Sequence, residues 1–253
     1  MRSTASAVLT GTALPVLREE ALSLARQYWD ARKKFKFGVE TGTIAECVDR
    51  ALKSKTQPVI LADSGDNPTG GGTGDRAEVL SELLRRNFQN AVFAGIAGRP
   101  ATDACYRDGV GATLNLKIGA TLDPKGSVPV ETTAKVIFLF KTDQPLERQA
   151  VVEVQGVKVV LTARRRPFHD IVDFTSLGLE PKSFKLIVVK SGYLSPELAP
   201  LANPNLMALS DGAINQDLEH LPKNQYRKPS YPFVPELRYT PYTVISARSR
   251  HSK

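Results

Sequence analysis

A loop rich in glycine and aspartate, set between a predicted strand and a predicted helix, constrains the fold of this chain more than any other feature. Residues 58–62 read PVILA, which is typical of a short buried strand, and apolar residues recur at helical spacing over residues 79–88. The residues between them, 62–75, read ADSGDNPTGGGTGD. Because loops that follow strands in open α/β sheets usually carry function, the pattern predicts a strand-loop-helix unit whose loop is a binding site.

Three carboxylates, one amide and three consecutive glycines are the candidate substrate-binding groups of this loop. They are Asp63, Asp66, Asp75, Asn67, Gly70, Gly71 and Gly72. The carboxylates repel a bare anion, whereas the glycines offer backbone N–H donors to a carboxylate or an oxyanion. The structural alternatives are an Asx turn at Asn67, a helix cap at Asp75 and glycines that only let the chain bend. Neither the G-x-G-x-x-G motif nor the P-loop ending is present.

The rest of the pattern alternates helices and strands around a strand-rich middle. Residues 15–36 carry apolar residues at steps of three and four, which predicts an amphipathic helix. Its apolar side is expected to pack on a core, with docking on another domain or lobe as the alternative. Further helices are predicted at 44–52, 101–107, 171–177 and 196–201, and strands at 91–96, 112–118, 128–140, 150–155, 157–163 and 184–189, with a hairpin turn at Gln155-Gly156. We therefore predict an α/β fold: a mixed sheet with flanking helices and an antiparallel strand section in the middle of the chain.

Charge, hydropathy and cysteine content limit the classes of partner. The formal net charge is +8, but residues 221–253 hold seven basic residues and one acidic residue, so this tail contributes +6 and the remainder +2. Since no recognition motif accompanies the tail, we expect no nucleic-acid partner, with binding through the tail as the alternative. No apolar run approaches the roughly 20 residues that span a bilayer, so we expect no membrane partner. Cys47 and Cys105 lie in helical patterns, which predicts buried free thiols rather than a disulfide. Free thiols favour a cytoplasmic location. The alternative location is an organelle, reached through an N-terminal transit segment.

Two later segments carry further candidates for a substrate site. Arg165 can bind a carboxylate through two parallel hydrogen bonds, although a solvated strand edge is the more common role. His169 next to Asp170 suggests a general base, and a hydrogen-bonded structural histidine is the alternative. Lys190 and Ser191 end an apolar strand, where open α/β sheets place ligands. No nucleophile motif and no local pair of metal ligands accompanies them, so the catalytic residues are unknown and no metal site is predicted in this chain.

Four segments together resemble the C-terminal part of the MlrC-type zinc metallopeptidase family. Residues 62–75 are similar to the family signature ADxxDNPGGGxxGD, and RRPFHD at 165–170, LGLEP at 177–181 and VVKS at 188–191 follow in matching order and spacing. On this resemblance we predict a non-matching segment at 1–14, connecting helices at 15–57, an MlrC-type C-terminal domain at 58–235 and a basic flexible tail at 236–253.

The resemblance implies a two-lobed hydrolase whose zinc is held by histidine and carboxylate ligands in an N-terminal lobe that this chain lacks. We therefore expect no cofactor in this chain, zinc in the other lobe, and a peptide-like or amide small molecule as substrate. The expected partner is such an N-terminal lobe or a second copy of this chain, and the chain alone is expected to be inactive. Two alternatives are a zinc site assembled from distant residues such as Asp66 and His169, and a stand-alone module whose glycine loop binds an anion or a partner chain. Residues 192–196 (GYLSP) depart from the family pattern, so the toxin substrate of microcystinase is not implied.

Overall fold

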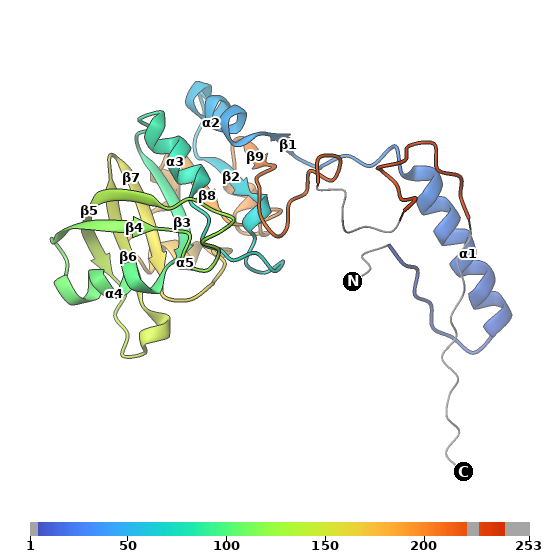
Figure 1. The fold of residues 1–253 in the computed structure, drawn as a ribbon, viewed down its shortest axis with the longest axis horizontal. Helices are drawn as coiled ribbons and strands as arrows, with labels where there is room; N and C mark the ends of the chain where they lie inside the picture. Colours follow the sequence, from blue (N-terminus) through green and yellow to red (C-terminus); the bar gives the residue numbers. More distant parts are fainter. Residues whose placement is uncertain (1–4, 222–227, 241–253) are drawn as a thin grey trace, which may run out of the picture. The chain divides into compact units, whose positions relative to one another are not determined.

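The computed structural model describes residues 5–221 and 228–240, which divide between two compact units (Figure 1). The larger unit is Gly38–Asp217, and the smaller one combines Met1–Phe37 with Leu218–Lys253. Domain boundaries drawn from the family resemblance stay a prediction. Most of the basic tail expected at 236–253 lies outside the described residues.

The larger unit is built on one nine-stranded sheet with the order β1-β9-β2-β8-β3-β7-β6-β5-β4. In this spatial order, the first six strands, β1, β9, β2, β8, β3 and β7, are all parallel to their neighbours. The pairs β7-β6, β6-β5 and β5-β4 are antiparallel. The strands are β1 (Glu40–Gly42), β2 (Val59–Asp63), β3 (Ala91–Ala97), β4 (Thr113–Ile118), β5 (Val130–Leu139), β6 (Gln149–Val154), β7 (Val157–Thr162), β8 (Leu186–Val189) and β9 (Asn205–Ala208). The predicted α/β class, with a mixed sheet and an antiparallel section from the middle of the chain, is confirmed.

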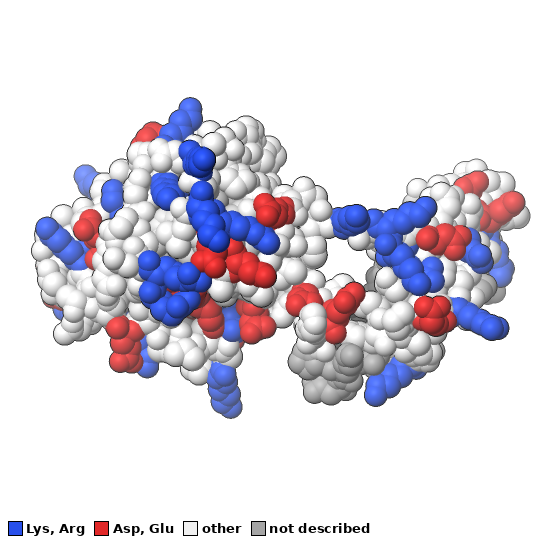
Figure 2. Space-filling model, turned by 90° about the horizontal axis from the view of Figure 1, so that it is seen from above, with Lys and Arg blue, Asp and Glu red and all other residues white. Residues whose placement is uncertain are grey.

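Charged side chains of both signs are interspersed over the face of the larger unit seen in Figure 2. Ion pairs link charged side chains of the larger unit; Arg86, for example, lies 2.6 Å from Asp49 and 2.9 Å from Glu82. Among the described residues, no helix is long and apolar enough to cross a membrane.

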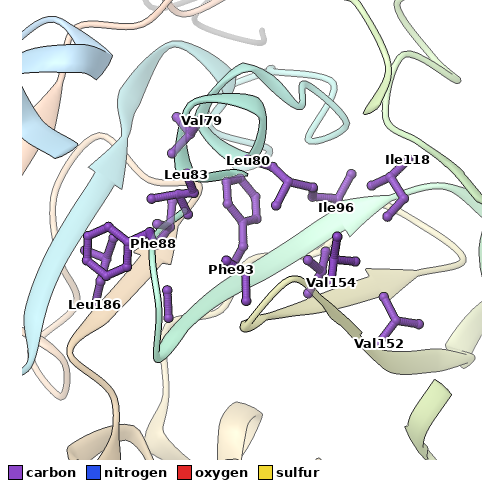
Figure 3. Packing of buried hydrophobic residues seen from close by; sticks show 14 of the residues in the cluster. Val79, Leu80, Leu83, Phe88, Phe93, Ile96, Ile118, Val152, Val154 and Leu186 are labelled. Atoms are coloured by element: carbon purple, nitrogen blue, oxygen red, sulfur yellow. The ribbon is translucent and has the colours of Figure 1, made fainter. Parts of the chain in front are cut away.

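Successive side chains along each strand point to opposite faces of the sheet, and this produces two apolar cores, one on each face. Helices α2 (Ile44–Lys53), α3 (Glu78–Arg85) and α4 (Arg99–Asp108) bury their apolar sides on one face. Figure 3 shows Val79, Leu80 and Leu83 of α3 lying over Phe93 and Ile96 of β3. The other face, which includes Ile60 and Val92, is covered by α5 (Ile171–Thr175) and the turns around it. Burial on both faces is why the central parallel strands read as continuous apolar runs.

Most predicted elements form, and the differences are local. The turn at Gln155-Gly156 has positive φ at both residues (48° and 86°), as a two-residue hairpin requires. The helix predicted at 196–201 is wrong: the segment forms only a 3-10 turn, Ala199–Leu201. Strands β1 and β9 were not predicted, since each has only three or four residues.

The helix predicted at 15–36 is α1 (Leu14–Ala31), in the smaller unit, and the expectation that it packs on a core is wrong because none of its residues is buried. Leu24 and Tyr28 are 46% and 54% exposed. Its partner segment is the C-terminal stretch: the Trp29 ring lies 6.2 Å from the ring of Tyr231 and 5.8 Å from that of Tyr239.

Candidate functional site

The candidate site lies where β2, β8 and β9 end side by side. These three strands are parallel neighbours, so their carboxyl ends share one edge of the sheet. Asp63 ends β2, Lys190 follows β8 and Ser210 follows β9. The topology therefore joins residues that are 127 and 147 positions apart in sequence. This placement agrees with the general location of ligand sites in open α/β sheets.

Lys190 is the centre of a buried ionic cluster at this edge. Its side chain is 2% exposed, and its Nζ donates to Asp63 Oδ2 at 3.0 Å, to Asp66 Oδ2 at 2.8 Å and to the carbonyl of Arg76 at 2.8 Å. Ser210 Oγ donates to the other oxygen of Asp63 at 2.5 Å. Burial alone would lower the pKa of Lys190, but the two adjacent carboxylates outweigh it and raise that pKa, so the ammonium stays charged.

Asp66 organises the glycine loop from within. Its oxygens accept from Thr73 Oγ1 at 3.0 Å, from the backbone N–H of Gly74 at 2.8 Å and from that of Arg76 at 2.8 Å, in addition to Lys190. Burial favours the neutral acid, but Lys190 and these hydrogen bonds outweigh it, and the pKa of Asp66 is lowered. Both oxygens are thus engaged inside the protein in this conformation. The predicted contact of Asp63 and Asp66 with a substrate stays a prediction.

The glycines of the loop serve close packing and unusual backbone conformations. A Cβ at Gly65 would lie 2.0 Å from the carbonyl oxygen of Ser210, and one at Gly72 would lie 2.6 Å from the carbonyl carbon of Asp66. Gly71 adopts a φ of 109°, which L-residues with side chains rarely adopt. The N–H groups of Gly70 and Gly72 donate to the carbonyl of Asn67 at 3.2 and 2.8 Å. These two donors are therefore used within the loop, and the predicted role of the three glycines towards a substrate stays a prediction.

Asn67 forms the predicted Asx turn, whereas Asp75 does not cap the helix. Asn67 Oδ1 accepts from the N–H and the hydroxyl of Thr69 at 2.9 and 2.8 Å. The N-cap of α3 is Ala77, with no side-chain cap, so the alternative of a cap at Asp75 is wrong. Asp75 Oδ2 instead accepts from the N–H groups of Leu122 and Asp123, which tethers the loop to the segment after β4. Its Oδ1 is buried without a partner among the described residues.

The remaining predicted residues lie on neighbouring loops. Arg165 Nη1 donates to the carbonyl of Gly72 at 2.9 Å, so it contacts the glycine loop directly. The backbone of His169 donates to Asp173 at 2.9 Å. Ser191 follows Lys190 and its hydroxyl donates to the carbonyl of Tyr193. Their roles towards a substrate stay predictions.

The flanking arginines each have their own carboxylate. Arg164 lies 2.8 Å from Glu147, and Arg166 lies 2.6 Å from Asp173. Two members of the cluster, Ser210 and Arg76, were not predicted. Ser210 could not be found because it follows the unpredicted strand β9, and nothing local to Arg76 marks its carbonyl as an acceptor for Lys190.

The residues present do not fit a zinc ion. Among the residues that the structure describes, no three His, Cys, Asp or Glu side chains come together as a ligand set. A structural or catalytic zinc needs three or four such ligands. The space between Asp63 and Asp66, where a cation could bind, holds the ammonium of Lys190. We therefore derive no zinc chemistry from this chain's own residues.

Fold and site together define an α/β domain whose loops converge at the carboxyl edge of a parallel sheet around a buried cluster of two carboxylates and one lysine. The family model described as MlrC C-terminus matches residues 61–225, and the chain belongs to this family. The resemblance noted from the sequence is thereby confirmed.

Two relatives show how the chain compares with longer proteins. Microcystinase C of Sphingomonas sp. is 23% identical over 192 residues, which cover 73% of this chain and 38% of that protein. A crystal structure from Mesorhizobium sp. BNC1, of a protein whose name describes it as a candidate metallopeptidase, matches with a TM-score of 0.71 and 20% identity over 90% of this chain and 47% of that one. At this identity the structural match shows the fold. The chain spans less than half the length of either relative.

Proposed function

We propose that this chain is the C-terminal lobe of an MlrC-type metallopeptidase or amide hydrolase and supplies loops that bind the substrate. The observation that carries the proposal is the Lys190 cluster, because it fixes the glycine loop after β2 to the ends of β8 and β9. A loop held by buried charge-assisted hydrogen bonds is preorganised, as a binding site on loops requires. Family membership supports the hydrolase class.

The zinc-bearing lobe remains the expected partner. The resemblance implies metal ligands in an N-terminal lobe, and relatives roughly twice as long as this chain support a second lobe. In this proposal the chain has no hydrolytic activity by itself, and its substrate is a peptide-like or amide small molecule. A cytoplasmic location belongs to the proposal too, supported by two buried cysteines that form no disulfide.

The charged side chains at the glycine loop do not single out an anion as the ligand. Two buried carboxylates, Asp63 and Asp66, face the ammonium of Lys190, and Arg165 adds a second positive charge where it donates to the carbonyl of Gly72. These charges balance, which suits an uncharged amide.

A complementation assay tests the proposal. The purified chain is analysed for zinc and assayed for peptide hydrolysis, alone and after co-expression with the N-terminal lobe of an MlrC-type protein. We expect no zinc-dependent activity alone and activity in the mixture, lost on chelation. Stoichiometric zinc with hydrolysis by the chain alone would overturn the proposal, as would a complex of the two lobes that remains inactive.

A further inference from the structure

Strand β4 leaves one edge of the nine-stranded sheet open. It pairs with β5 on one side, and no strand of the described residues pairs with its other side. The N–H of Val136 donates to the carbonyl of Ala112, so the even-numbered residues of β4 form the hydrogen-bonded pairs with β5. The backbone N–H and C=O groups of Thr113, Asn115 and Lys117 therefore point away from the sheet. Among the described residues these groups have no partner.

The two edges of the sheet are protected differently. Proteins usually protect a free edge by keeping the strand short, by a bulge or a proline, or by covering it. The strand at the opposite edge, β1, has only three residues. In contrast, β4 has six residues, contains no proline and keeps an unbroken register with β5 over its whole length. A regular open edge of this kind is a template for pairing with another chain.

The surroundings of this edge are open and partly apolar. A shallow groove is lined by residues 115–117 of β4 and 131–133 of β5, so the middle of the two strands is accessible. Val110 precedes β4, Leu122 follows it and Val128 precedes β5, and they are 63%, 54% and 75% exposed. These side chains add apolar area to the contact with any chain that pairs along the edge.

The polar face of β4 is complementary to itself in the antiparallel direction. When two copies pair with Asn115 opposite Asn115, Thr113 of each copy lies opposite Lys117 of the other. Only this register pairs all three outward residues with one another, and each such pair exchanges two backbone hydrogen bonds. The two lysines then lie about 13 Å apart along the strands, so salt screens their repulsion.

The opposite face of the same pairing joins apolar side chains. Leu116 is 6% exposed and Leu114 is partly buried, and both pack on the core that α4 covers. In the register centred on Asn115, Leu114 of each copy lies opposite Leu116 of the other, and apolar cross-strand pairs stabilise a sheet. Matching on both faces at once favours a second copy of this chain as the occupant of the edge.

We propose that two copies of this chain pair through β4, antiparallel and centred on Asn115, so that one sheet runs through both copies. The strands that carry the Lys190 cluster are separated from β4 by β3, β7, β6 and β5. The pairing therefore does not involve the candidate site, and the inference does not depend on the proposed function.

Disulfide trapping tests the contact and its register. In the paired state the two Cα atoms of residue 115 are about 5.5 Å apart, which a disulfide can bridge. Under mild oxidation Asn115→Cys should therefore give a covalent dimer on a non-reducing gel. Lys117→Cys alone should not, because its two copies lie about 13 Å apart, whereas a mixture of Thr113→Cys and Lys117→Cys proteins should link. The native thiols of Cys47 and Cys105 are buried and give no background.

Sedimentation equilibrium measures the strength of the pairing. All proteins in this assay carry Leu24→Glu and Tyr28→Glu, because the exposed side of α1 is another surface on which copies can associate. Asn115→Pro removes an outward N–H that the chain's own fold does not use, and proline is tolerated on an edge strand. It should raise the Kd of the dimer at least tenfold, which corresponds to about 1.4 kcal/mol. The control Asn115→Thr keeps that N–H and should leave the Kd unchanged.

The sign of the charge at position 113 gives a second readout. Because residue 113 of each copy faces Lys117 of the other, Thr113→Glu should lower the Kd and Thr113→Lys should raise it. Lys135 of the same copy also lies opposite residue 113. A Lys117→Glu background isolates the contact between copies, since it should reverse the order of the two variants.

Three results would overturn the pairing. The first is a protein that stays monomeric at every concentration in the background with the α1 substitutions, as expected if β4 receives a strand of another protein instead. The second is an equal yield of covalent dimer from Asn115→Cys and Lys117→Cys. The third is an equal Kd for Asn115→Pro and Asn115→Thr proteins whose circular dichroism shows the native fold. The complementation assay has no bearing on these results, so each proposal can fail without the other.

Discussion

Replacing Lys190 by methionine should destabilise the larger unit more than any surface change, because it leaves two buried carboxylates without their cation. Methionine preserves most of the aliphatic stem and removes only the ammonium. Removing one partner of a buried ion pair typically costs about 3–5 kcal/mol. Since Asp63 and Asp66 both lose a hydrogen bond at 3.0 Å or less, we expect an effect in the upper part of that range.

The two carboxylates should not share this cost equally. Asp66 keeps three other donors, from Thr73, Gly74 and Arg76, whereas the described partner left to Asp63 is the hydroxyl of Ser210. Asp63→Asn in the Lys190→Met background should therefore restore part of the loss. Asp66→Asn should not, because an amide NH2 would face backbone N–H donors.

The effect should depend on pH. The pKa of Asp66 is lowered in the folded protein, so its ion pair contributes stability above the unfolded pKa of about 3.9 and loses it as pH falls through the lowered value. In the variant, buried carboxylates without a cation take up protons on acidification. The difference between wild type and variant should thus be largest near neutrality and shrink towards pH 4.

Urea unfolding followed by far-UV circular dichroism measures this difference. Tryptophan fluorescence is unsuitable, since the single tryptophan, Trp29, lies on α1 in the smaller unit. Lys117→Met is the matched control, because Lys117 is 66% exposed and pairs with Glu131 only at 3.7 Å, and it should cost less than about 1 kcal/mol. A loss below about 1 kcal/mol for Lys190→Met at pH 7, or an equal loss at pH 4, would refute the reasoning.

Three further predictions follow from packing and burial. Gly65→Ala should abolish the native fold or destabilise it by several kcal/mol, because its Cβ would lie 2.0 Å from the carbonyl oxygen of Ser210. The control Gly38→Ala, whose Cβ would have nothing within 4 Å, should change the free energy of unfolding by less than about 0.5 kcal/mol. Equal urea midpoints for the two variants would contradict the prediction. Burial raises the pKa of the Cys47 and Cys105 thiols to about 11. An aromatic disulfide reagent at pH 8 should therefore modify neither thiol until urea unfolds the chain. The free energy of unfolding should decline above about pH 8.5, because the thiols of the unfolded chain ionise before those of the folded protein. Leu24→Glu with Tyr28→Glu should reduce self-association in sedimentation velocity, because both side chains are about half exposed on α1; a wild-type chain that is already monomeric would refute it.

Local pattern was sufficient to predict the elements that flank the site. The buried strand, the glycine loop and the helix after it form one continuous segment. The strand and the helix are each predicted by the spacing of their apolar residues, and the loop by its glycines. Lys190 could be selected because it ends an apolar strand. Its ion pairs could not be predicted, because they depend on β8 lying directly beside β2 in the sheet. No local sequence pattern indicates the order of strands in a sheet.

The unpredicted parts share a physical cause. Strand β9 has four residues and begins directly after an Asn-Pro step, so its signal is too short to separate from a turn. Ser210 was missed with it. Asp75 has the residue type of a helix cap, but tertiary contacts with Leu122 and Asp123 override that local preference.

The distance along the chain between the members of the Lys190 cluster also determines when the loop can become ordered. Asp63 meets Lys190 across 127 positions and Ser210 across 147, so its two side-chain contacts form only after β8 and β9, the last two strands, have joined the sheet. Contacts of such separation form late, because loop closure must precede any gain from them. A growing or truncated chain that ends before β9 (Asn205–Ala208) has the glycine loop but not the hydroxyl that holds Asp63. Resistance of residues 63–75 to proteases should therefore report completion of the sheet, and it should appear only once β9 has docked beside β2.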